Sequence, residues 1–526
     1  MLTMRENFQS GNRERLWRKY CGFLDLSITE FMEMQEQLLM DHIDLVYNSP
    51  LANKFMPEKP TSVAEFRRLV PFTTYDDYAP LLGDKKESAL AIKPYCWAHT
   101  SGRGGSTKWV PITRAAMEHM LNAAIGMSIL ASANRKGEIN IRNGMKVLLN
   151  MPPAPYFSGI LAPLMIDRLG AQAIPPLDKY ANASFDERIQ AGLRIAFRTG
   201  VDFVSSLTAV MIRIGERLSE GSPQMKFNRH MLHPRIMSRI LIALIRSKRE
   251  KRSLLPKDFW RLKGLVCYGM ETGIYREQLI KYWGRTPFEV YVATEAGTIA
   301  MQSWNKKAMT PLPYSCFLEF ISESEWLNNR KDNNHQPRTV LLDEVKPGEC
   351  YEVVLTSFHG MPFFRYKLGD IVKVVALEDR ESGIVLPQLV FQSRTSDIID
   401  IAGFSRLDEK TIWQAIANTG VKYEDWCARK EYEEDKPIVH VYIELRQEIP
   451  VEDLEKAINK NLAEIDKNYS DLLNYLGLRG LKVSIIPTGS FQKYYEAKRK
   501  AGADLAHLKP PHMNPSDAIM MELINR

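Results

Sequence analysis

The sequence is poor in cysteine. Its six cysteines, Cys21, Cys96, Cys267, Cys316, Cys350 and Cys427, are scattered along the chain without a C-x-x-C pair. A disulfide framework or a structural zinc site needs paired or closely spaced cysteines, so the sequence indicates neither. We therefore expect reduced thiols in a cytoplasmic protein.

Long apolar runs are also missing. The stretch MLTMRENFQSGNRERLW carries no apolar signal segment, and no run is long enough to span a bilayer, so we expect no integral membrane segment. The most lipid-like stretch is RIMSRILIALIRSKREKR, residues 235–252, which combines an apolar face with a basic end. The favoured interpretation is an amphipathic helix packed on the protein with its basic end in solvent. The alternative is a helix on a membrane surface.

The excess of basic residues is small for the size of the chain. A net charge of +7 and a pI near 8.8 are compatible with anionic substrates but too weak to indicate nucleic acid as a partner. An apolar share of 45% and a charged share of 25% are ordinary for a globular protein. At 526 residues the chain is too long for one hydrophobic core, and we expect two domains, one of them large.

Strand-like and helix-like segments alternate through the first half of the chain. Short buried strands are predicted in KVLLN, VDFVSSL and LKGLVCYG, and LGAQAIPP reads as the end of another strand. The sequence between them is helical, which favours a mainly parallel α/β body. Further on, CYEVVLTSF, FFRYKLGDIVKVVAL and LPQLVFQSR are β-rich and separated by turn signals, as in an antiparallel or barrel-like subdomain.

The last part of the chain reads as a small α+β unit. It combines an alternating strand IVHVYIEL, a helix over about 451–465 and a strand LKVSIIP. We place the domain boundary near Ser396. The prediction is an α/β protein with a large N-terminal domain over 1–395 and a smaller α+β domain over 396–526.

A glycine-rich loop, TSGRGGSTK, runs from Thr100 to Lys108. Backbone N–H groups in a glycine turn form a nest for phosphate oxygens, hydroxyls add donors and a lysine supplies charge. The spacing does not fit a Walker A motif. The alternative is a plain surface connector. The residues predicted to contact phosphate are Thr100, Ser101, Gly102, Arg103, Gly104, Gly105, Ser106 and Lys108.

Three shorter motifs follow in order: YVATE over 291–295, FRYKLGD over 364–370 and SRTSDIIDIAGF from 393. A carboxylate such as that of Asp370 can accept hydrogen bonds from both hydroxyls of a ribose, and Gly369 lets the backbone turn to aim it. Each motif has an ordinary alternative. Gly369 and Asp370 also suit a hairpin turn, and Arg394 also suits a surface salt bridge.

Taken in order, these motifs resemble those of the adenylate-forming enzymes, T-S-G-S/T-T-G-x-P-K, Y-x-x-T/S-E, Y-R-x-G-D and G-R-x-D-D-x-I-K-x-x-G-F. The resemblance implies that the Tyr291 ring lies by adenine and that Thr294 reaches phosphate. It implies that Glu295 helps to hold Mg²⁺, a hard cation that suits a carboxylate and phosphate oxygens. Arg394 would meet ribose or phosphate, and the pivot between domains would be Ser396 or the residue after it.

The tail of the chain is similar to one branch, the GH3 family of acyl acid amido synthetases. The usual P-K-T-x-x-G-K is absent. Instead, NKNLAEIDKNYSDLL and LKVSIIPTGSFQKYYEAKRKAGADLAHLKPPHM resemble that family's N-x-x-Y, G-T-F and G-A-x-x-x-Q-x-K-x-P pattern. The early LVPFTTYDDYAPLL resembles its V-P-x-x-x-Y-x-D-x-x-P-Y-I. The matching positions in the tail are Gly489, Phe491, Gly502, Ala503, Lys509 and Pro511.

The sequence departs from that family in its loop, which is one residue shorter than S-S-G-T-S-G-G-x-x-K. Arg103 and Gly104 replace hydroxyl residues there, which puts those side-chain contacts to phosphate in doubt, and Arg103 would supply charge instead. Thr294 stands where many members have serine.

The resemblance implies a two-step reaction with ATP and Mg²⁺ as cofactors and with a carboxylic acid and an amine, usually an amino acid, as small-molecule partners. The acid forms an acyl-adenylate with release of pyrophosphate, and the amine then displaces AMP to give an amide. Lys509, on a mobile C-terminal domain, would neutralise charge in the first step, with Lys493 as its rival. Tyr156 and Phe157 are candidates for the wall of the acyl pocket, although core packing explains them equally well.

Three other functions stay open. An acyl-CoA ligase shares the first step but uses a thiol in place of the amine. A protein that binds ATP or an acyl acid without catalysis would keep the same scaffold. An adaptor that associates with membranes through residues 235–252 would bind lipid without using the nucleotide site.

Overall fold

The computed structural model describes residues 13–101, 107–151, 153–180, 183, 185–219, 234–268, 272–331, 335–401, 405–433, 436–467, 469–470, 480–500 and 512–524. Contacts divide the chain into two units. Unit 1 comprises Met1–Leu368 and Val372–Phe391, and unit 2 comprises Gly369–Ile371 and Gln392–Arg526. The domain boundary near Ser396 stays a prediction.

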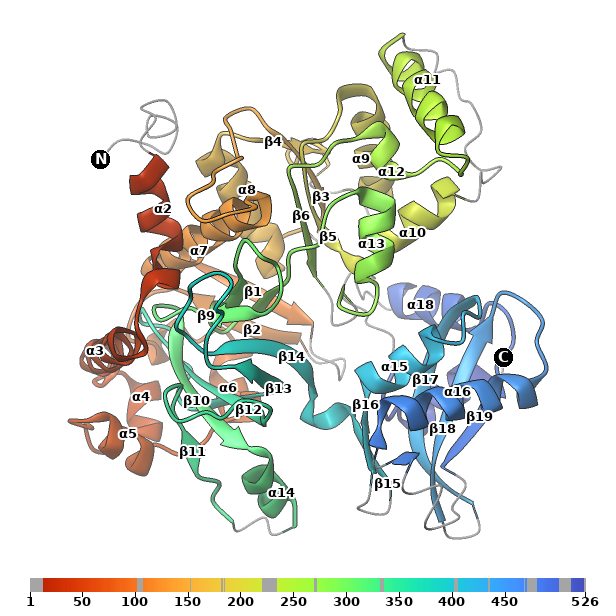
Figure 1. Cartoon of the computed structure of the whole chain (residues 1–526). Helices are drawn as coiled ribbons and strands as arrows, with labels where there is room; N and C mark the ends of the chain where they lie inside the picture. Colours follow the sequence, from red (N-terminus) through yellow and green to blue (C-terminus); the bar gives the residue numbers. More distant parts are fainter. Residues whose placement is uncertain are drawn as a thin grey trace. The chain divides into compact units, whose positions relative to one another are not determined.

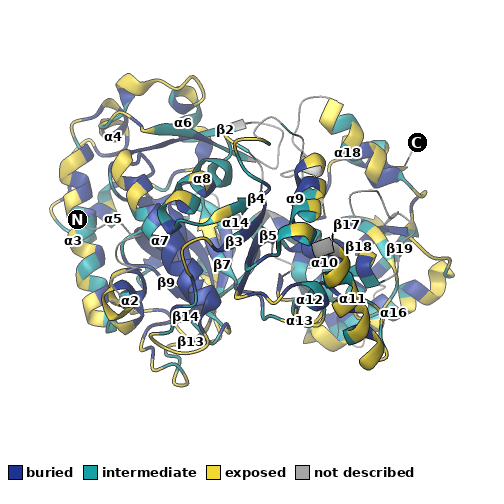
Figure 2. Cartoon of the chain, turned by 90° about the horizontal axis from the view of Figure 1, so that it is seen from above, coloured by how far each residue is buried: buried dark blue, intermediate teal, exposed yellow. Residues whose placement is uncertain are grey.

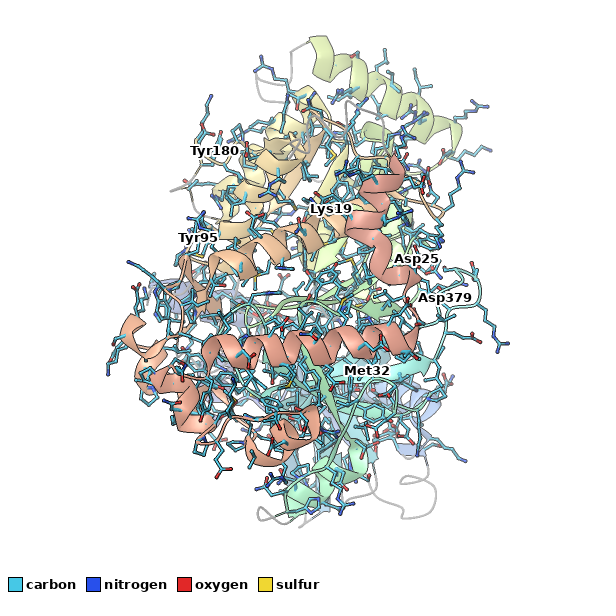
Figure 3. The ribbon with its side chains drawn as sticks, turned by 90° about the vertical axis from the view of Figure 1, so that its left-hand side faces the viewer. Lys19, Asp25, Met32, Tyr95, Tyr180 and Asp379 are labelled. Atoms are coloured by element: carbon cyan, nitrogen blue, oxygen red, sulfur yellow. The ribbon has the colours of Figure 1, made fainter. Side chains whose placement is uncertain are left out.

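Unit 1 begins with a series of helices that pack against its hydrophobic core. They are α2 (Arg13–Cys21), η1 (Gly22–Asp25), α3 (Ile28–Val46), α4 (Pro50–Phe55), α5 (Val63–Leu69), α6 (Tyr75–Leu82) and η2 (Glu87–Ala89). Helix α3 starts at a capping box, in which the Ser27 Oγ accepts from the Glu30 N–H (3.2 Å) and the Glu30 carboxylate accepts from the Ser27 N–H (2.8 Å). Figure 3 shows the face that carries α2 and α3, with Lys19 and Met32 labelled.

A four-stranded parallel sheet forms the α/β part of unit 1, as the alternating sequence predicts. Its order is β4 (Gln172–Ile174), β3 (Lys146–Asn150), β5 (Phe203–Leu207), β6 (Gly264–Tyr268), and every pairing is parallel. The strands are almost continuous apolar runs because helices cover both faces. The first face packs on α7 (Arg114–Ser132) and α8 (Phe157–Leu169); the second packs on α9 (Phe185–Thr199), α10 (Thr208–Ser219) and α13 (Arg276–Trp283) (Figure 1).

Residues 234–249 form helix α11 (Pro234–Arg249), which contacts α9 and the short helix α12 (Pro256–Phe259). The predicted amphipathic helix is therefore confirmed, as is its packing on the protein. Most of its described large apolar side chains, however, are exposed to the solvent, which is the reverse of the ordinary pattern. Within the described residues, no helix is both long enough and apolar enough to cross a membrane.

The β-rich segments form an eight-stranded sheet that completes unit 1. Its order runs from β11 at one edge to β7 at the other, and the pairings β7–β8, β8–β9, β9–β14, β10–β11 and β10–β12 are antiparallel, as predicted. Helix α14 (Glu323–Lys331) follows β10. In sheet order the strands are β11 (Thr339–Val340), β10 (Cys316–Ser322), β12 (Cys350–Ser357), β13 (Tyr366–Ala376), β14 (Gln388–Arg394), β9 (Met309–Pro311), β8 (Gly297–Gln302) and β7 (Val290–Ala293).

Unit 2 is an α+β unit, as predicted. Strand β18 (Lys436–Leu445) pairs antiparallel with β17 (Tyr423–Glu433) and parallel with β19 (Leu481–Ile485). The predicted helix is α16 (Val451–Ile465), and it buries Leu454, Ile458 and Leu462, which are spaced by four residues on one face. The remaining elements are η5 (Thr395–Asp397), the antiparallel pair β15 (Ile398–Ile401) and β16 (Ser405–Asp408), α15 (Glu409–Ala417), α18 (Ser490–Lys500) and α19 (Asp517–Ile524).

Candidate active site

The glycine-rich loop joins the two strands of a hairpin, β1 (Cys96–Ser101) and β2 (Thr107–Ile112). Thr100 lies opposite Lys108 in the antiparallel register, and Ser101 lies opposite Thr107. Thus both flanks of the loop are ordered strand. The predicted phosphate ligands Gly102, Arg103, Gly104, Gly105 and Ser106 lie outside the described residues.

The Tyr75 side chain holds this hairpin against α6. Its hydroxyl accepts a hydrogen bond from the Trp109 N–H (2.6 Å) and donates one to the Trp109 carbonyl (3.1 Å). The Lys108 Nζ lies 5.2 Å from the centre of the Tyr75 ring. Burial raises the pKa of Tyr75, and the negative charge of Glu295 raises it further, so Lys108 and Glu295 both lie in the surroundings of one ring.

Glu295 is buried in the turn between β7 and β8. Its Oε1 accepts a hydrogen bond from the Tyr366 hydroxyl (3.2 Å), and its backbone carbonyl accepts one from the Ser357 Oγ (2.6 Å). Gly297, which ends the turn, has φ of +74°, and a Cβ there would come within 2.6 Å of Met120, so only glycine fits. Burial and then the charge of Glu295 raise the pKa of Tyr366 far above its usual range, which keeps its hydroxyl protonated as a donor.

The other two predicted site residues of the YVATE motif, Tyr291 and Thr294, lie on either side of the end of β7. Tyr291 is buried within the strand, and its ring centre lies 5.9 Å from that of Phe391 in β14. Thr294 is half-buried in the turn beside Glu295. A place for adenine beside Tyr291 stays a prediction.

The early motif and the third motif lie side by side in unit 1, although almost 300 residues separate them. The Thr73 N–H donates to the Arg365 carbonyl (3.1 Å), and the Lys367 N–H donates to the Thr73 carbonyl (2.9 Å). The Thr73 hydroxyl also donates to the Phe364 carbonyl (2.6 Å), and the Phe364 N–H donates to the Tyr78 hydroxyl (2.9 Å). These bonds place Tyr366 beside Tyr75 and next to Glu295.

Arg365 is a residue that sequence reasoning missed. Its buried guanidinium makes two parallel hydrogen bonds to the Glu319 carboxylate (3.0 and 2.9 Å) and donates to the carbonyls of Arg67 (2.6 Å) and Val70 (2.8 Å). It therefore ties the third motif to β10 and to the end of α5. The signal in the sequence is a lone arginine within the apolar run FFRY, because a buried charge needs partners.

In unit 2, Asp370 and Arg394 form an ion pair, with 3.0 Å between the Asp370 Oδ1 and the Arg394 Nε. The Asp370 side chain is buried, while that of Arg394 is 36% exposed. Gly369 has φ of +73°, and a Cβ there would lie 3.3 Å from the Thr395 Oγ1. The hairpin-turn interpretation of Gly369 and Asp370 is wrong, because both lie inside strand β13. The interpretation of Arg394 as a salt-bridge residue is confirmed, and its partner is the other predicted ribose ligand.

The candidates for the acyl pocket lie against the hairpin in unit 1. The Tyr156 ring packs edge-on against His99 of β1, with 4.7 Å between ring centres, and the His99 N–H donates to the Pro155 carbonyl (2.9 Å). Phe157 is the first residue of α8 and is half-buried against the core. His99 was missed by sequence reasoning, and burial and then the positive charge of Lys85 lower its pKa, so its ring is neutral at neutral pH.

The structure describes only one of the two candidate lysines of the tail. Lys493 is exposed on α18, and its backbone N–H donates to the Gly489 carbonyl (3.0 Å). Lys509 lies outside the described residues, so the choice between the two stays a prediction. His512, three residues after Lys509, is buried between the carboxylates of Glu409 (2.7 Å) and Asp425 (2.8 Å).

Comparisons with known proteins agree on one family. Sequence models of the GH3 family N-terminal domain, central domain and C-terminal domain match residues 22–151, 309–394 and 409–517. A jasmonoyl–L-amino acid synthetase GH3.5 of Oryza sativa subsp. japonica is 26% identical over 49% of this chain and 47% of its own. An indole-3-acetic acid-amido synthetase GH3.10 of Arabidopsis thaliana is 26% identical over 36% of this chain and 32% of its own. The chain thus spans about half the length of the curated relatives it matches, or less.

Solved structures agree in fold. The structure titled AtGH3.15 acyl acid amido synthetase in complex with 2,4-DB has a TM-score of 0.70 at 15% identity and covers 98% of this chain and 96% of its own. A 2-hydroxyisobutyryl-CoA ligase has a TM-score of 0.53 at 14% identity and covers 90% of this chain and 91% of its own. At these identities the likeness concerns the fold.

Proposed function

Because the chain belongs to the GH3 family, we propose that it is an ATP-dependent acyl acid amido synthetase. In this proposal, a carboxylic acid attacks the α-phosphate of ATP, which forms an acyl-adenylate and releases pyrophosphate. The amine of an amino acid then attacks the acyl carbon, AMP leaves, and an amide forms. One curated relative is named a jasmonoyl–L-amino acid synthetase and another an indole-3-acetic acid-amido synthetase, and these names support an acid and an amino acid as the substrate classes.

The observation that carries the proposal is the meeting of three motifs around Tyr75 in unit 1. The Lys108 ammonium lies over the Tyr75 ring, the charge of Glu295 acts on the same hydroxyl, and Tyr366 donates to Glu295. A cation beside a buried, oriented carboxylate suits the triphosphate of ATP together with Mg²⁺, which prefers oxygen ligands from a carboxylate and from phosphates. When bound, Mg·ATP supplies an electrophilic phosphorus and a good leaving group.

Each of these side chains has a separate task in the proposal. Lys108, at the end of the glycine-rich loop, offsets phosphate charge, which otherwise repels the approaching carboxylate. Glu295 holds the divalent cation through its carboxylate. Tyr366 donates to that carboxylate and Ser357 donates to the backbone carbonyl of the same residue, so little reorganisation is needed when the nucleotide arrives.

In the same proposal, the Asp370 carboxylate accepts from the ribose hydroxyls, and its ion pair with Arg394 orients it. Lys509 is the proposed cation for adenylation, and Lys493 is its rival. Tyr156 lines the acid site beside His99 in both steps, and Phe157 supports it from α8. The cytoplasm is the proposed compartment, because the scattered cysteines favour reduced thiols.

The test is to measure AMP release from ATP with a panel of aromatic, jasmonate-like and fatty acids, crossed with amino acids and with coenzyme A. We expect acid-dependent pyrophosphate exchange, followed by AMP release and an amide product when an amino acid is added. Lys108→Ala should lower exchange at least about tenfold, because it removes a charge that acts in the transition state. Lys93→Ala, which changes an 83% exposed lysine of the same unit, is the matched control.

Two results would contradict the proposal. Exchange without amide formation, but with a thioester on addition of coenzyme A, would favour the acyl-CoA ligase. The absence of acid-dependent exchange across the whole panel, with ATP still bound, would favour a binding protein without catalysis.

A further inference from the structure

Helix α11 exposes an apolar ridge to the solvent. Its large apolar side chains are Met237, Leu241, Ile242, Leu244 and Ile245, and their exposed fractions are 53, 60, 47, 39 and 57%. Leu241 and Ile245, which are the most exposed, lie one turn apart on the outermost line of the helix. Figure 2 colours much of α11 as exposed. No other helix of the described chain exposes as many large apolar side chains.

Among the described residues of α11, the buried side chains are small, and Ile240 is half-buried. Ala243 and Ser247 are buried there. Arg239 donates to the carbonyls of Ala196 (3.3 Å) and Phe197 (3.4 Å), and Arg246 donates to the Asp258 carbonyl (2.9 Å). Hydrogen bonds, rather than apolar burial, therefore hold the helix to unit 1. An ordinary surface helix has the opposite arrangement, with its apolar stripe toward the core.

The charges on α11 are all of one sign. The helix carries five basic residues and no acidic one within Pro234–Arg249. Lys248 and Arg249 are exposed at its C-terminal end, directly beyond the ridge formed by Leu241 and Ile245. At 1.5 Å per residue the helix is about 24 Å long, so it presents an apolar ridge of a few turns with a cationic end.

We propose that α11 docks unit 1 on an anionic lipid surface, with its apolar ridge among the acyl chains and with Lys248 and Arg249 at the headgroups. A helix with an apolar face and a basic polar end lies in the plane of a membrane interface. Anionic headgroups are complementary to a helix without carboxylates, and long basic side chains reach them while their stems stay in apolar surroundings.

The charges of α11 argue against a second copy of the chain as the occupant. Two copies of the ridge packed in parallel would bring the Lys248 and Arg249 ends together. In the antiparallel arrangement, each basic end would lie near the start of the other helix, which carries no acidic residue. Neither arrangement therefore gives the basic ends a carboxylate of the helix as a partner.

The experiment uses the full chain and vesicles of phosphatidylcholine, either alone or with about a third phosphatidylserine. We expect flotation with the anionic vesicles only, weakened by salt because surface charges are screened. Leu241→Gln/Ile245→Gln should lower the partition coefficient at least about tenfold, since two inserted side chains lose their apolar burial. Lys248→Glu/Arg249→Glu should lower it about twentyfold or more, at about fivefold for each basic residue.

Leu45→Gln is the matched control, because Leu45 is a 50% exposed leucine on α3, away from α11 in the chain. It should bind vesicles as the original protein does. Acid-dependent pyrophosphate exchange, measured on the same samples, should be unchanged in all variants, because the inference does not depend on the proposed reaction. Retained exchange also shows that a variant has folded.

Three results would overturn the inference. The first is failure of the original protein to bind anionic vesicles. The second is binding that is equal with and without phosphatidylserine, or that Leu45→Gln weakens as much as Leu241→Gln/Ile245→Gln does. The third is a dimer in lipid-free solution that the same double change abolishes, because a second copy would then cover the ridge.

Discussion

His512 makes the ion cluster of unit 2 sensitive to pH in a direction that can be worked out from its surroundings. Its Nδ1 faces the Glu409 Oε1 at 2.7 Å and its Nε2 faces the Asp425 Oδ1 at 2.8 Å, while its ring stacks on Trp426. Burial alone would lower the pKa, but the two carboxylates outweigh it and raise the pKa of His512 to about 9.

The shift sets both the size and the window of the effect. A pKa of about 9, against 6.5 in the unfolded chain, corresponds to about 3 kcal/mol of stability from the protonated ring. Because the folded pKa is the higher one, this stability is fully present below pH 6.5. It is lost as the pH rises through about 9, where the folded protein releases the proton.

The perturbation is His512→Gln, which keeps polar atoms between the two carboxylates but removes the cation. Cys427 reports on the unfolding of unit 2, because it is buried in β17 next to Trp426. Its alkylation can be followed by mass spectrometry across a urea series at pH 6.5 and pH 9.5. The stability that the variant loses relative to the original protein should be about 3 kcal/mol larger at pH 6.5 than at pH 9.5.

His440→Gln is the control in the same unit. Burial lowers the pKa of His440 despite its hydrogen bond to Glu431, so protonation of this ring does not stabilise the folded protein as that of His512 does. The stability difference that this variant causes should therefore be the same at pH 6.5 and pH 9.5. If the stability difference between His512→Gln and the original protein were also the same at both pH values, the His512 ring would be neutral in the folded protein. That result would refute the prediction.

Further predictions concern the candidate site residues of each unit and the residues that support them. Arg365→Leu should lower the free energy of unfolding by about 3 kcal/mol, because it leaves the Glu319 carboxylate buried without its main partner; a loss below about 1 kcal/mol in a urea series would contradict this. Tyr366→Phe removes the donor to Glu295 and should slow acid-dependent pyrophosphate exchange about tenfold with little change in the unfolding midpoint, whereas an unchanged rate would separate the pair from catalysis. Asp370→Asn should weaken ATP binding about tenfold in calorimetry, and an unchanged affinity would remove the ribose assignment.

The regular parts of the fold could be predicted from sequence because each carries a local signal. The strands of the parallel sheet are short apolar runs, and α16 has one apolar face with a period of four. Strand β13 was predicted as well, but the dipeptide Gly369–Asp370 inside it also suited a turn. Only the pairing of β13 with its neighbours decides between the two, and pairing is not a local property.

The candidate site was predictable only in part for the same reason. Motif residues such as Glu295 and Asp370 stand out by their spacing. Their supports do not, because the partners are distant in the chain: Arg365 and Glu319 are 46 positions apart, and Thr73 and Phe364 are 291 apart. Periodicity also identified α11 as amphipathic but does not say which face turns inward. The hydrogen bonds of its arginines decide that, and they are tertiary contacts.

The two tyrosines of the candidate site supply hydrogen-bond donors without adding charge. Burial and Glu295 raise the pKa values of both Tyr75 and Tyr366, so both hydroxyls stay protonated. Tyr366 donates to the Glu295 carboxylate, and Tyr75 donates to the Trp109 carbonyl of the hairpin. A neutral group therefore orients the Glu295 carboxylate, and the Lys108 ammonium lies 5.2 Å from the centre of the Tyr75 ring. In the proposed function, a nucleotide and its cation would meet these two described charges already oriented, which is the condition for electrostatic stabilisation without reorganisation.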